Sequence, residues 1–191
     1  MWSESRLAGS GLSTSWTCLV AILAATRLTD GRGIGTLPDV EFFDELMRAA
    51  LAEARKALDL DEVPIGAVIA TEGRIVATGF NQPITSSDPT AHAEIVALRA
   101  AARGVGNYRL SGATLCVTLE PCAMCVGALV HARIGMLVFG AFEPKTGAVR
   151  SAMNLVEHPS WNHRIEVVSG VLESECREIV QRFFREKRGQ R

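Results

Sequence analysis

The sequence lacks several features that would assign it to a well-defined class of proteins. No uninterrupted apolar run approaches the roughly 18 residues of a membrane-spanning helix. Neither sign of charge is in excess, because 20 basic residues face 21 acidic ones for a net charge of −1. Proteins that coat nucleic acid non-specifically depend on many cationic phosphate contacts, so this balance excludes that class. The sequence also has no internal repeat.

Cysteine is scarce as well, with five residues among 191. The number is odd, and Cys122 and Cys125 form a Cys-x-x-Cys pair. Small secreted domains that depend on disulfides carry an even and denser set of cysteines. The pattern therefore favours metal or redox chemistry over a disulfide framework.

The composition is that of a globular domain, with 48% hydrophobic and 21% charged residues, which excludes wholesale disorder. We expect residues 38–191 to form one folded domain behind a leader, residues 1–37, that is rich in Gly, Ser and Thr. The apolar run at residues 16–25 has the length of a secretory signal core, but Glu4 precedes it and no clean cleavage site follows. The alternatives are a disordered leader and a start codon assigned too far upstream.

Charge is distributed unevenly along the chain. Residues 39–62 hold eight acidic and three basic residues, whereas residues 177–191 hold six basic and two acidic ones. A basic tail is typical of a solvated helix end, and it is also typical of a local site for polyanions.

Apolar periodicity predicts a layered α/β domain with one sheet between helices. Thr71-Glu72-Gly73-Arg74 separates two β-branched runs and predicts a hairpin. We expect Asp39 to cap the first helix, Gly104 to end the second and Pro121 to lie in the first turn of the third. The expected helices are residues 39–58, 91–103, 121–132 and 173–188, with a short helical turn at 151–156, and the expected strands are 64–70, 75–80, 114–119, 136–139 and 165–169.

Two short motifs lie at the starts of two predicted helices. These are His92-Ala93-Glu94 and Pro121-Cys122-Ala123-Met124-Cys125. The helix, loop and strand between them can bring both helix starts to one edge of the sheet, where helix N-termini favour thiolates. Three protein ligands, His92, Cys122 and Cys125, suit a catalytic zinc, whose fourth position is left to water. Glu94 lies two residues beyond His92, within reach of that water, and can carry its proton.

Each motif taken alone has a simpler explanation. A Cys-x-x-Cys pair is often a redox pair or half of a structural zinc site, a single helix histidine is usually a satisfied polar group, and Glu94 alone is typical of a solvated first-turn acid. In combination, His-x-Glu followed by Pro-Cys-x-x-Cys is the signature of zinc-dependent deaminases of nucleobases.

Beyond this signature, the sequence resembles the bacterial tRNA-specific adenosine deaminases, which convert the wobble adenosine of an anticodon to inosine. The resemblance runs from about residue 39 to residue 188. The matching segments are residues 62–68, 79–83, 88–94, 107–110, 117–125, 133–135, 138–141, 145–148, 158–159 and 162–164.

The resemblance implies a cytidine-deaminase-like fold, a three-layer α/β/α sandwich with a five-stranded mixed sheet. It implies one Zn²⁺ per subunit, bound by His92, Cys122 and Cys125, with Glu94 as the proton carrier. It further implies a cytoplasmic homodimer that acts on a tRNA anticodon stem-loop, with neither membrane nor DNA as a partner. Water activated by the zinc would attack C6 of adenine, and Glu94 would protonate the departing ammonia.

Four further residues match positions that contact RNA in the family. Asn81 matches the residue that hydrogen-bonds the flipped adenine, although an asparagine before Pro83 is also typical of a turn. The backbone near Ala93 would contact the base. Glu143 stands where many relatives have an aspartate that contacts the ribose. Phe184 belongs to a C-terminal aromatic pair beside basic residues, which suits base stacking, although two phenylalanines on an amphipathic helix are also typical of a core.

Three alternatives of other kinds share these residues. A zinc deaminase of free bases or nucleosides, of guanine or cytosine type, would keep the same motif. A structural zinc or RNA-binding module would not need Glu94. A redox protein would form a disulfide between Cys122 and Cys125.

Overall fold

The structure is a computed structural model and describes residues 40–189. The predicted leader, residues 1–37, and the predicted cap Asp39 lie outside the described residues. The helices are α2 (Val40–Asp59), α3 (Ala93–Val105), α4 (Ala123–His131) and α5 (Glu173–Gly189), and the strands are β1 (Gly66–Thr71), β2 (Arg74–Phe80), β3 (Thr114–Leu119), β4 (Met136–Ala141) and β5 (Glu166–Ser169). None of the helices within residues 40–189 is both long and apolar enough to cross a membrane.

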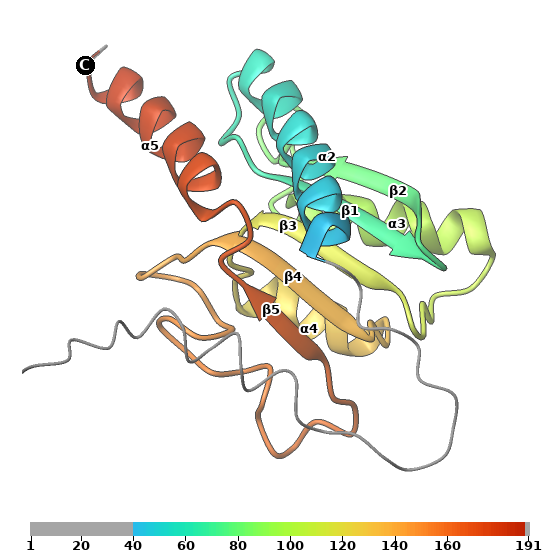
Figure 1. The fold of residues 1–191 in the computed structure, drawn as a ribbon. Coiled ribbons are helices and arrows are strands. Elements are labelled where there is room, and N and C mark those ends of the chain that lie inside the picture. Colours follow the sequence, from blue (N-terminus) through green and yellow to red (C-terminus); the bar gives the residue numbers. More distant parts are fainter. Residues whose placement is uncertain (1–39, 190–191) are drawn as a thin grey trace, which may run out of the picture. The chain divides into compact units, whose positions relative to one another are not determined.

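The five strands form one mixed sheet in the order β2-β1-β3-β4-β5 (Figure 1). Strand β1 pairs antiparallel with β2 and with β3, whereas β3, β4 and β5 run parallel to one another. Helix α4 connects β3 to β4, as a parallel pair requires a crossover. The predicted five-stranded mixed sheet is confirmed.

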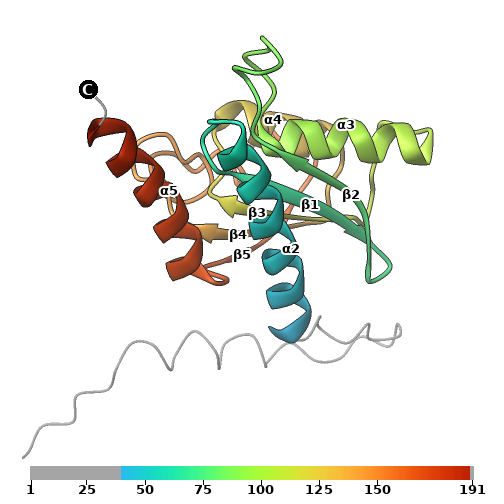
Figure 2. The ribbon, with the colours of Figure 1, turned by 90° about the horizontal axis from the view of Figure 1, so that it is seen from above.

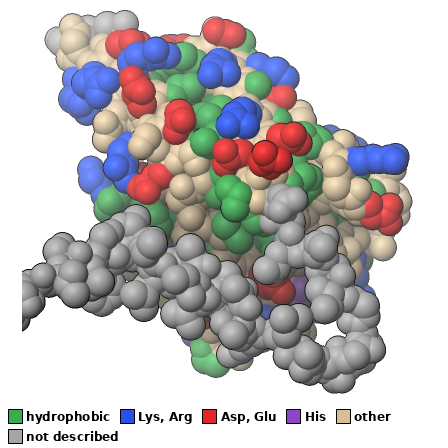
Figure 3. All heavy atoms as spheres, in the orientation of Figure 1, with side chains coloured by type: hydrophobic (Ala, Val, Ile, Leu, Met, Phe, Trp, Pro, Cys, Tyr) green, Lys and Arg blue, Asp and Glu red, His purple; other side chains and the backbone are tan. Residues whose placement is uncertain are grey.

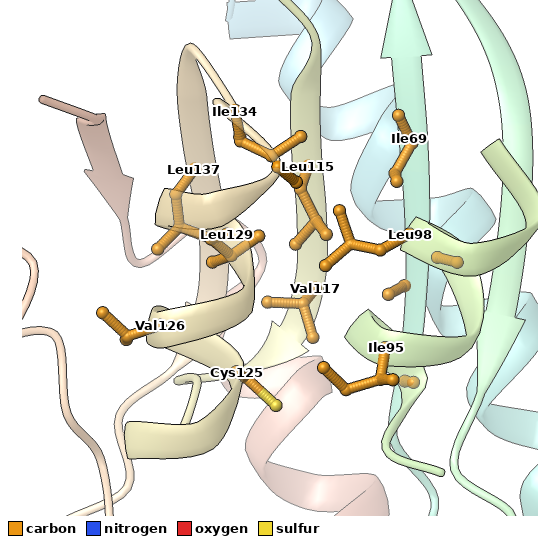
Figure 4. Packing of buried hydrophobic residues seen from close by; sticks show 14 of the residues in the cluster. Ile69, Ile95, Leu98, Leu115, Val117, Cys125, Val126, Leu129, Ile134 and Leu137 are labelled. Carbon is orange, nitrogen blue, oxygen red and sulfur yellow. The ribbon is translucent and has the colours of Figure 1, made fainter. Parts of the chain in front are cut away.

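The central strands are buried on both faces, which explains their nearly continuous apolar sequences. Along β3, Leu115 and Val117 face α3 and α4, whereas Cys116 faces α2 and α5. Figure 2 shows α3 and α4 on one side of the sheet and α2 and α5 on the other. Figure 4 shows Leu98 of α3 and Leu129 of α4 packing on either side of Leu115. Two apolar layers thus enclose the sheet, which is the predicted three-layer arrangement.

The predicted hairpin is also confirmed. Glu72 and Gly73 both have positive φ, at 52° and 73°, between the paired residues Thr71 and Arg74. Two successive positive φ angles define the type I′ turn, whose twist matches that of the flanking strands.

Three local predictions were wrong. Helix α3 continues through Gly104 and ends at Val105, and its C-cap Gly106 has a φ of 69° and donates its N–H to the carbonyl of Ala102. That left-handed conformation, which glycine adopts without a Cβ clash, is what terminates the helix. Pro121 precedes the N-cap Cys122 and therefore lies outside α4. Residues 151–156 form no helical turn, because the N–H groups of the segment bond to the preceding loop and to Glu120 instead.

Gly66 generates a prediction about how tightly α2 packs on the sheet. A Cβ at Gly66 would stand 2.0 Å from the carbonyl oxygen of Ala50 and 2.4 Å from the nitrogen of Ala54, which are backbone atoms of α2. We expect Gly66→Ala to lower the free energy of unfolding by about 3 kcal/mol, since backbone cannot rotate away from the methyl group.

Gly104→Ala is the matched control, because a Cβ there meets nothing within 4 Å. In the interior of a helix, alanine is favoured over glycine by about 0.5–1 kcal/mol. Urea unfolding followed by circular dichroism measures both variants. Equal midpoints for the two variants would contradict the close approach.

Candidate metal and catalytic site

The predicted ligands come together at the starts of α3 and α4. His92 is the N-cap residue of α3, and Cys122 is the N-cap residue of α4, with Cys125 one turn further along. Neither N-cap side chain forms a capping hydrogen bond with its own helix. Both side chains are therefore free to face each other, although 30 residues separate them in the sequence.

The distances within this group fit a tetrahedral metal site. Nδ1 of His92 lies 3.7 Å from Sγ of Cys122 and 3.5 Å from Sγ of Cys125, and the two sulfur atoms are 3.7 Å apart. With Zn–S of about 2.3 Å and Zn–N of about 2.0–2.1 Å, tetrahedral geometry places two sulfur ligands about 3.8 Å apart and sulfur and nitrogen about 3.6 Å apart. The three residues thus form a group positioned to bind a metal ion.

The electrostatics of the group favour the ligand form of one cysteine. The hydrogen bond with Cys125 lowers the pKa of Cys122 to about 3, against the opposing effect of burial and with help from His92. The same bond, together with burial, raises the pKa of Cys125. The pKa of His92 is raised in turn by the hydrogen bond between His92 and Cys122. Since the thiolate is the form that binds metals, Cys122 is prepared for coordination at neutral pH.

Glu94 lies in the first turn of α3, two residues beyond His92, and only 4% of it is exposed. Burial raises the pKa of its carboxyl group above the ordinary value, with smaller opposing effects from hydrogen bonding and from His92. A buried carboxyl beside three atoms that could hold a metal ion is suited to proton transfer. Ala93, between Glu94 and His92, is fully buried.

Asn81 lies directly after β2, where its N–H donates to the carbonyl of Ile65 over 2.9 Å. The residue is 5% exposed, and its side-chain oxygen Oδ1 has no hydrogen-bond partner within the described residues. A turn asparagine uses that oxygen to accept a nearby backbone N–H. The unpartnered oxygen is available to a ligand instead.

A groove of about 950 Å³ opens at the carboxyl ends of β3 and β4. Its lining includes Glu143, Lys145, Phe184, Arg185 and Arg188. Figure 3 shows basic side chains, interspersed with acidic ones, over α5. Leu119, the last residue of β3, lines this groove, and Cys122 follows it three residues later in the sequence. Two of the predicted residues, Glu143 and Phe184, therefore lie together in this groove.

The two adjacent phenylalanines of α5 differ in their exposure. Phe183 is 7% exposed and belongs to the buried apolar set, whereas Phe184 is 43% exposed and faces the groove. Glu143 accepts the N–H of Lys145 through Oε1, so one of its carboxylate oxygens is already engaged.

Sequence reasoning missed two buried carboxylates near the site. Glu62 is 1% exposed, and its Oε1 accepts both the N–H and the hydroxyl of Thr85. Glu120 is 4% exposed and accepts five hydrogen bonds from residues 143–151. Burial alone would raise the pKa of Glu120, but these hydrogen bonds hold it below the usual range. For Glu120, the available signal in the sequence was its position directly after an apolar strand and directly before Pro121.

Comparison with known proteins gives consistent matches. The family model described as MafB19-like deaminase matches residues 43–188. The chain is 50% identical over 149 residues to the tRNA-specific adenosine deaminase of Haemophilus influenzae, covering 78% of this chain and 86% of that protein. It is also 50% identical over 146 residues to the tRNA-specific adenosine deaminase of Bacillus subtilis, covering 76% and 91%.

Solved structures show the same fold. A structure from a study of A-to-I editing by tRNA:A34 deaminases at the wobble position is 48% identical, covers 71% of this chain and 98% of that chain, and has a TM-score of 0.69. The guanine deaminase of Nitrosomonas europaea is 22% identical, covers 82% and 98%, and has a TM-score of 0.63. At that identity, the second match bears on the fold alone.

The metal site can be tested by removing one ligand. We expect Cys125→Ala to lower the metal bound per chain at least tenfold, because two remaining ligands do not define a tetrahedral site. Cys116→Ala is the control, since this cysteine is equally buried but contacts Sδ of Met47 instead. Elemental mass spectrometry of the purified proteins gives the stoichiometry. Equal metal content in the two variants would rule out Cys125 as a ligand.

Proposed function

The chain belongs to the family of tRNA-specific adenosine deaminases, and from that membership and the geometry of the site we propose its reaction. It hydrolyses the exocyclic amine of the wobble adenosine in a tRNA anticodon loop, which yields inosine and ammonia. The observation that carries the proposal is the zinc-like spacing of His92, Cys122 and Cys125 beside the buried Glu94. Identity of 50% to curated relatives over most of their length supports the substrate.

We propose that the metal is one Zn²⁺ per subunit, held by His92, Cys122 and Cys125. Support comes from the mixed nitrogen and sulfur ligands, from their distances and from the family. When bound, zinc supplies Lewis acidity that lowers the pKa of water to about 7. Three protein ligands would leave the fourth position open to that water, as in catalytic zinc sites.

Glu94 is the proton carrier of this reaction. It takes the proton from the attacking water and delivers it to the amine that leaves C6 of adenine, so atoms and charges balance over one cycle. Its position supports the role, because the first turn of α3 holds both Glu94 and the ligand His92. Burial of Glu94 keeps bulk water from competing for the proton.

Asn81 holds the base. Its unpartnered, buried Oδ1 can accept a hydrogen bond from an adenine N–H, which gives that oxygen the partner it lacks within the protein. The backbone at Ala93 offers a further contact. Because the anticodon loop is single-stranded, moving the base into the pocket costs less than extracting it from a duplex.

The groove between α5 and residues 141–146 receives the flanking nucleotides. Arg177, Arg185, Arg188 and Lys145 supply positive charge for phosphates, and Phe184 offers an exposed ring for stacking. Glu143 lies on the same wall, where its free carboxylate oxygen can contact a ribose. A deaminase of free bases has no need of such a surface. The groove and the identity of the relatives therefore favour RNA over a free base.

We propose that the enzyme works as a cytoplasmic homodimer, as the family resemblance implies. Transfer RNA is its partner, and neither DNA nor a membrane is expected.

The central experiment is inosine formation in an anticodon hairpin that carries adenosine at the wobble position. We expect the zinc-loaded protein to convert this hairpin. Glu94→Gln should slow conversion by about 10²–10⁴-fold while retaining its zinc, because the amide cannot carry a proton. Liquid chromatography of the digested RNA measures inosine, and elemental analysis measures the metal.

Free adenine, guanine and cytidine are the parallel substrates. Conversion of guanine without conversion of the hairpin would replace the proposed function by that of a free-base deaminase. Full activity of Glu94→Gln would show that Glu94 does not carry the proton.

We expect different effects from replacing each of the two phenylalanines of α5. Phe184→Ala should raise the KM for the hairpin about tenfold with unchanged stability, since base stacking on an aromatic ring contributes about 1–3 kcal/mol. Phe183→Ala should lower the free energy of unfolding by about 3–5 kcal/mol through the cavity it leaves. Steady-state kinetics and urea unfolding of both variants separate the two roles. If Phe183→Ala instead raised the KM and Phe184→Ala lowered the stability, Phe183 would be the residue that contacts RNA.

A further inference from the structure

Glu120 occupies an unusual position between the sheet and the metal site. It follows Leu119, the last residue of β3, and lies two residues before Cys122. Its N–H donates to the carbonyl of Ala141 over 2.9 Å, so its backbone extends the pairing of β3 with β4. Only 4% of the residue is exposed. The carboxylate is therefore buried at the point where the sheet passes into the metal-binding helix.

The hydrogen bonds of this carboxylate all come from the segment 143–151. Oε1 accepts the backbone N–H groups of Val149, Arg150 and Ser151 over 3.1, 2.7 and 2.9 Å. Oε2 accepts the N–H of Glu143 over 3.0 Å and the hydroxyl of Ser151. An ionised carboxylate is the only side-chain group that can accept this many bonds without donating any. One side chain thus binds both ends of the loop.

The loop also contacts the metal-binding segment through its backbone. Gly147 forms an antiparallel bridge with Cys122, and Ala148 donates its N–H to the carbonyl of Pro121 over 2.8 Å. A Cβ at Gly147 would stand 2.4 Å from Oε2 of Glu120 and 2.5 Å from the carbonyl oxygen of Glu143. Glycine is required there because the loop closes directly around the carboxylate.

The inner and outer faces of this loop differ in exposure. Gly147, Ala148 and Val149 are buried around Glu120, whereas Lys145 and Thr146 are exposed. The outer residues 142–146 line the groove opposite α5. The carboxylate therefore supports, from behind, the wall on which the proposed RNA contacts lie.

We propose that Glu120 is a positioning residue for RNA: its carboxylate holds residues 143–151 in the one conformation that completes the groove. Its place two residues before Cys122 is incidental to the chemistry, since within residues 40–189 its carboxylate bonds only with residues 143–151. The inference rests on the proposed function, because the groove is assigned to RNA there. It predicts that loosening the loop weakens binding of the anticodon hairpin more than it slows the chemical step.

Glu120→Gln probes one end of the loop. An amide can keep its oxygen toward the three N–H groups of residues 149–151, but its NH₂ group then faces the N–H of Glu143. Two donors cannot form a hydrogen bond with each other, so the loop should open at Glu143 and stay closed at residues 149–151. Glu120→Ala should open both ends. Hydrogen exchange followed by mass spectrometry should show faster exchange at peptides spanning residue 143 in the first variant, and throughout 143–151 in the second.

Binding and kinetics give the second readout. For Glu120→Gln we expect Kd and KM for the hairpin to rise about tenfold or more, kcat to change less than about threefold, and metal content to stay at the wild-type value. Gly147→Ala should reproduce this pattern by displacing the same carboxylate. Glu166→Gln, at an exposed position on β5, is the matched control and should match the wild type throughout. If Glu120→Gln fails to fold, Ser151→Ala removes a single donor and should give a smaller rise in Kd.

The outcomes are distinguishable. Wild-type protein that neither binds nor deaminates the hairpin would overturn the proposed function. Active wild-type protein with unchanged Kd in Glu120→Gln, despite faster exchange at residue 143, would overturn the positioning role alone. Loss of metal and of kcat together, with KM unchanged, would likewise overturn it and place Glu120 in support of Cys122.

Discussion

The site depends on how closely α3 lies against β2. A Cβ at Gly79 would stand 2.6 Å from the carbonyl oxygen of Ala93 and 2.6 Å from the nitrogen of Ala97, so strand and helix backbones are almost in contact. This approach fixes the first turn of α3, which carries His92 at its N-cap and Glu94 two residues later. Helix α4 is fixed in turn by the crossover from β3 to β4. The candidate metal ligands meet because both helix starts are held by the sheet, and neither N-cap side chain is used for capping.

Two buried carboxylates organise the loops around this rigid centre. Glu62 accepts the N–H and hydroxyl of Thr85 in the loop between β2 and α3, and Glu120 accepts five donors from residues 143–151. Loops carry backbone N–H groups that no strand or helix satisfies, and burying them unpaired would be costly. Each of these carboxylates satisfies more than one donor at once. The rims of the site are therefore held by side chains, while its centre is held by secondary structure.

The sequence predicted those features that depend on neighbouring residues. The ligand motif, the hairpin at Glu72-Gly73 and the apolar runs of the buried strands all have short-range patterns, and the structure has them as expected. It could not predict features set by distant contacts. Gly104 and Gly106 look alike in the sequence, and only the left-handed geometry at Gly106 ends the helix. Phe183 and Phe184 differ in exposure because of what α5 packs against. The role of Glu120 depends on donors at least 23 residues away.

The pairing of β1 with β3 has a consequence for the order in which the chain assembles. Strands β1 and β2 are joined by a two-residue turn and can pair early, whereas Ala67 pairs with Val117 across 50 residues of chain. His92 lies inside that long loop, and Cys122 lies just beyond it. A metal ion that bridged the two would cross-link the chain across 30 residues and shorten the loop that β1 and β3 must close, so it would favour this slow, non-local step of folding. Metal supply would then influence how quickly newly made protein reaches its native state.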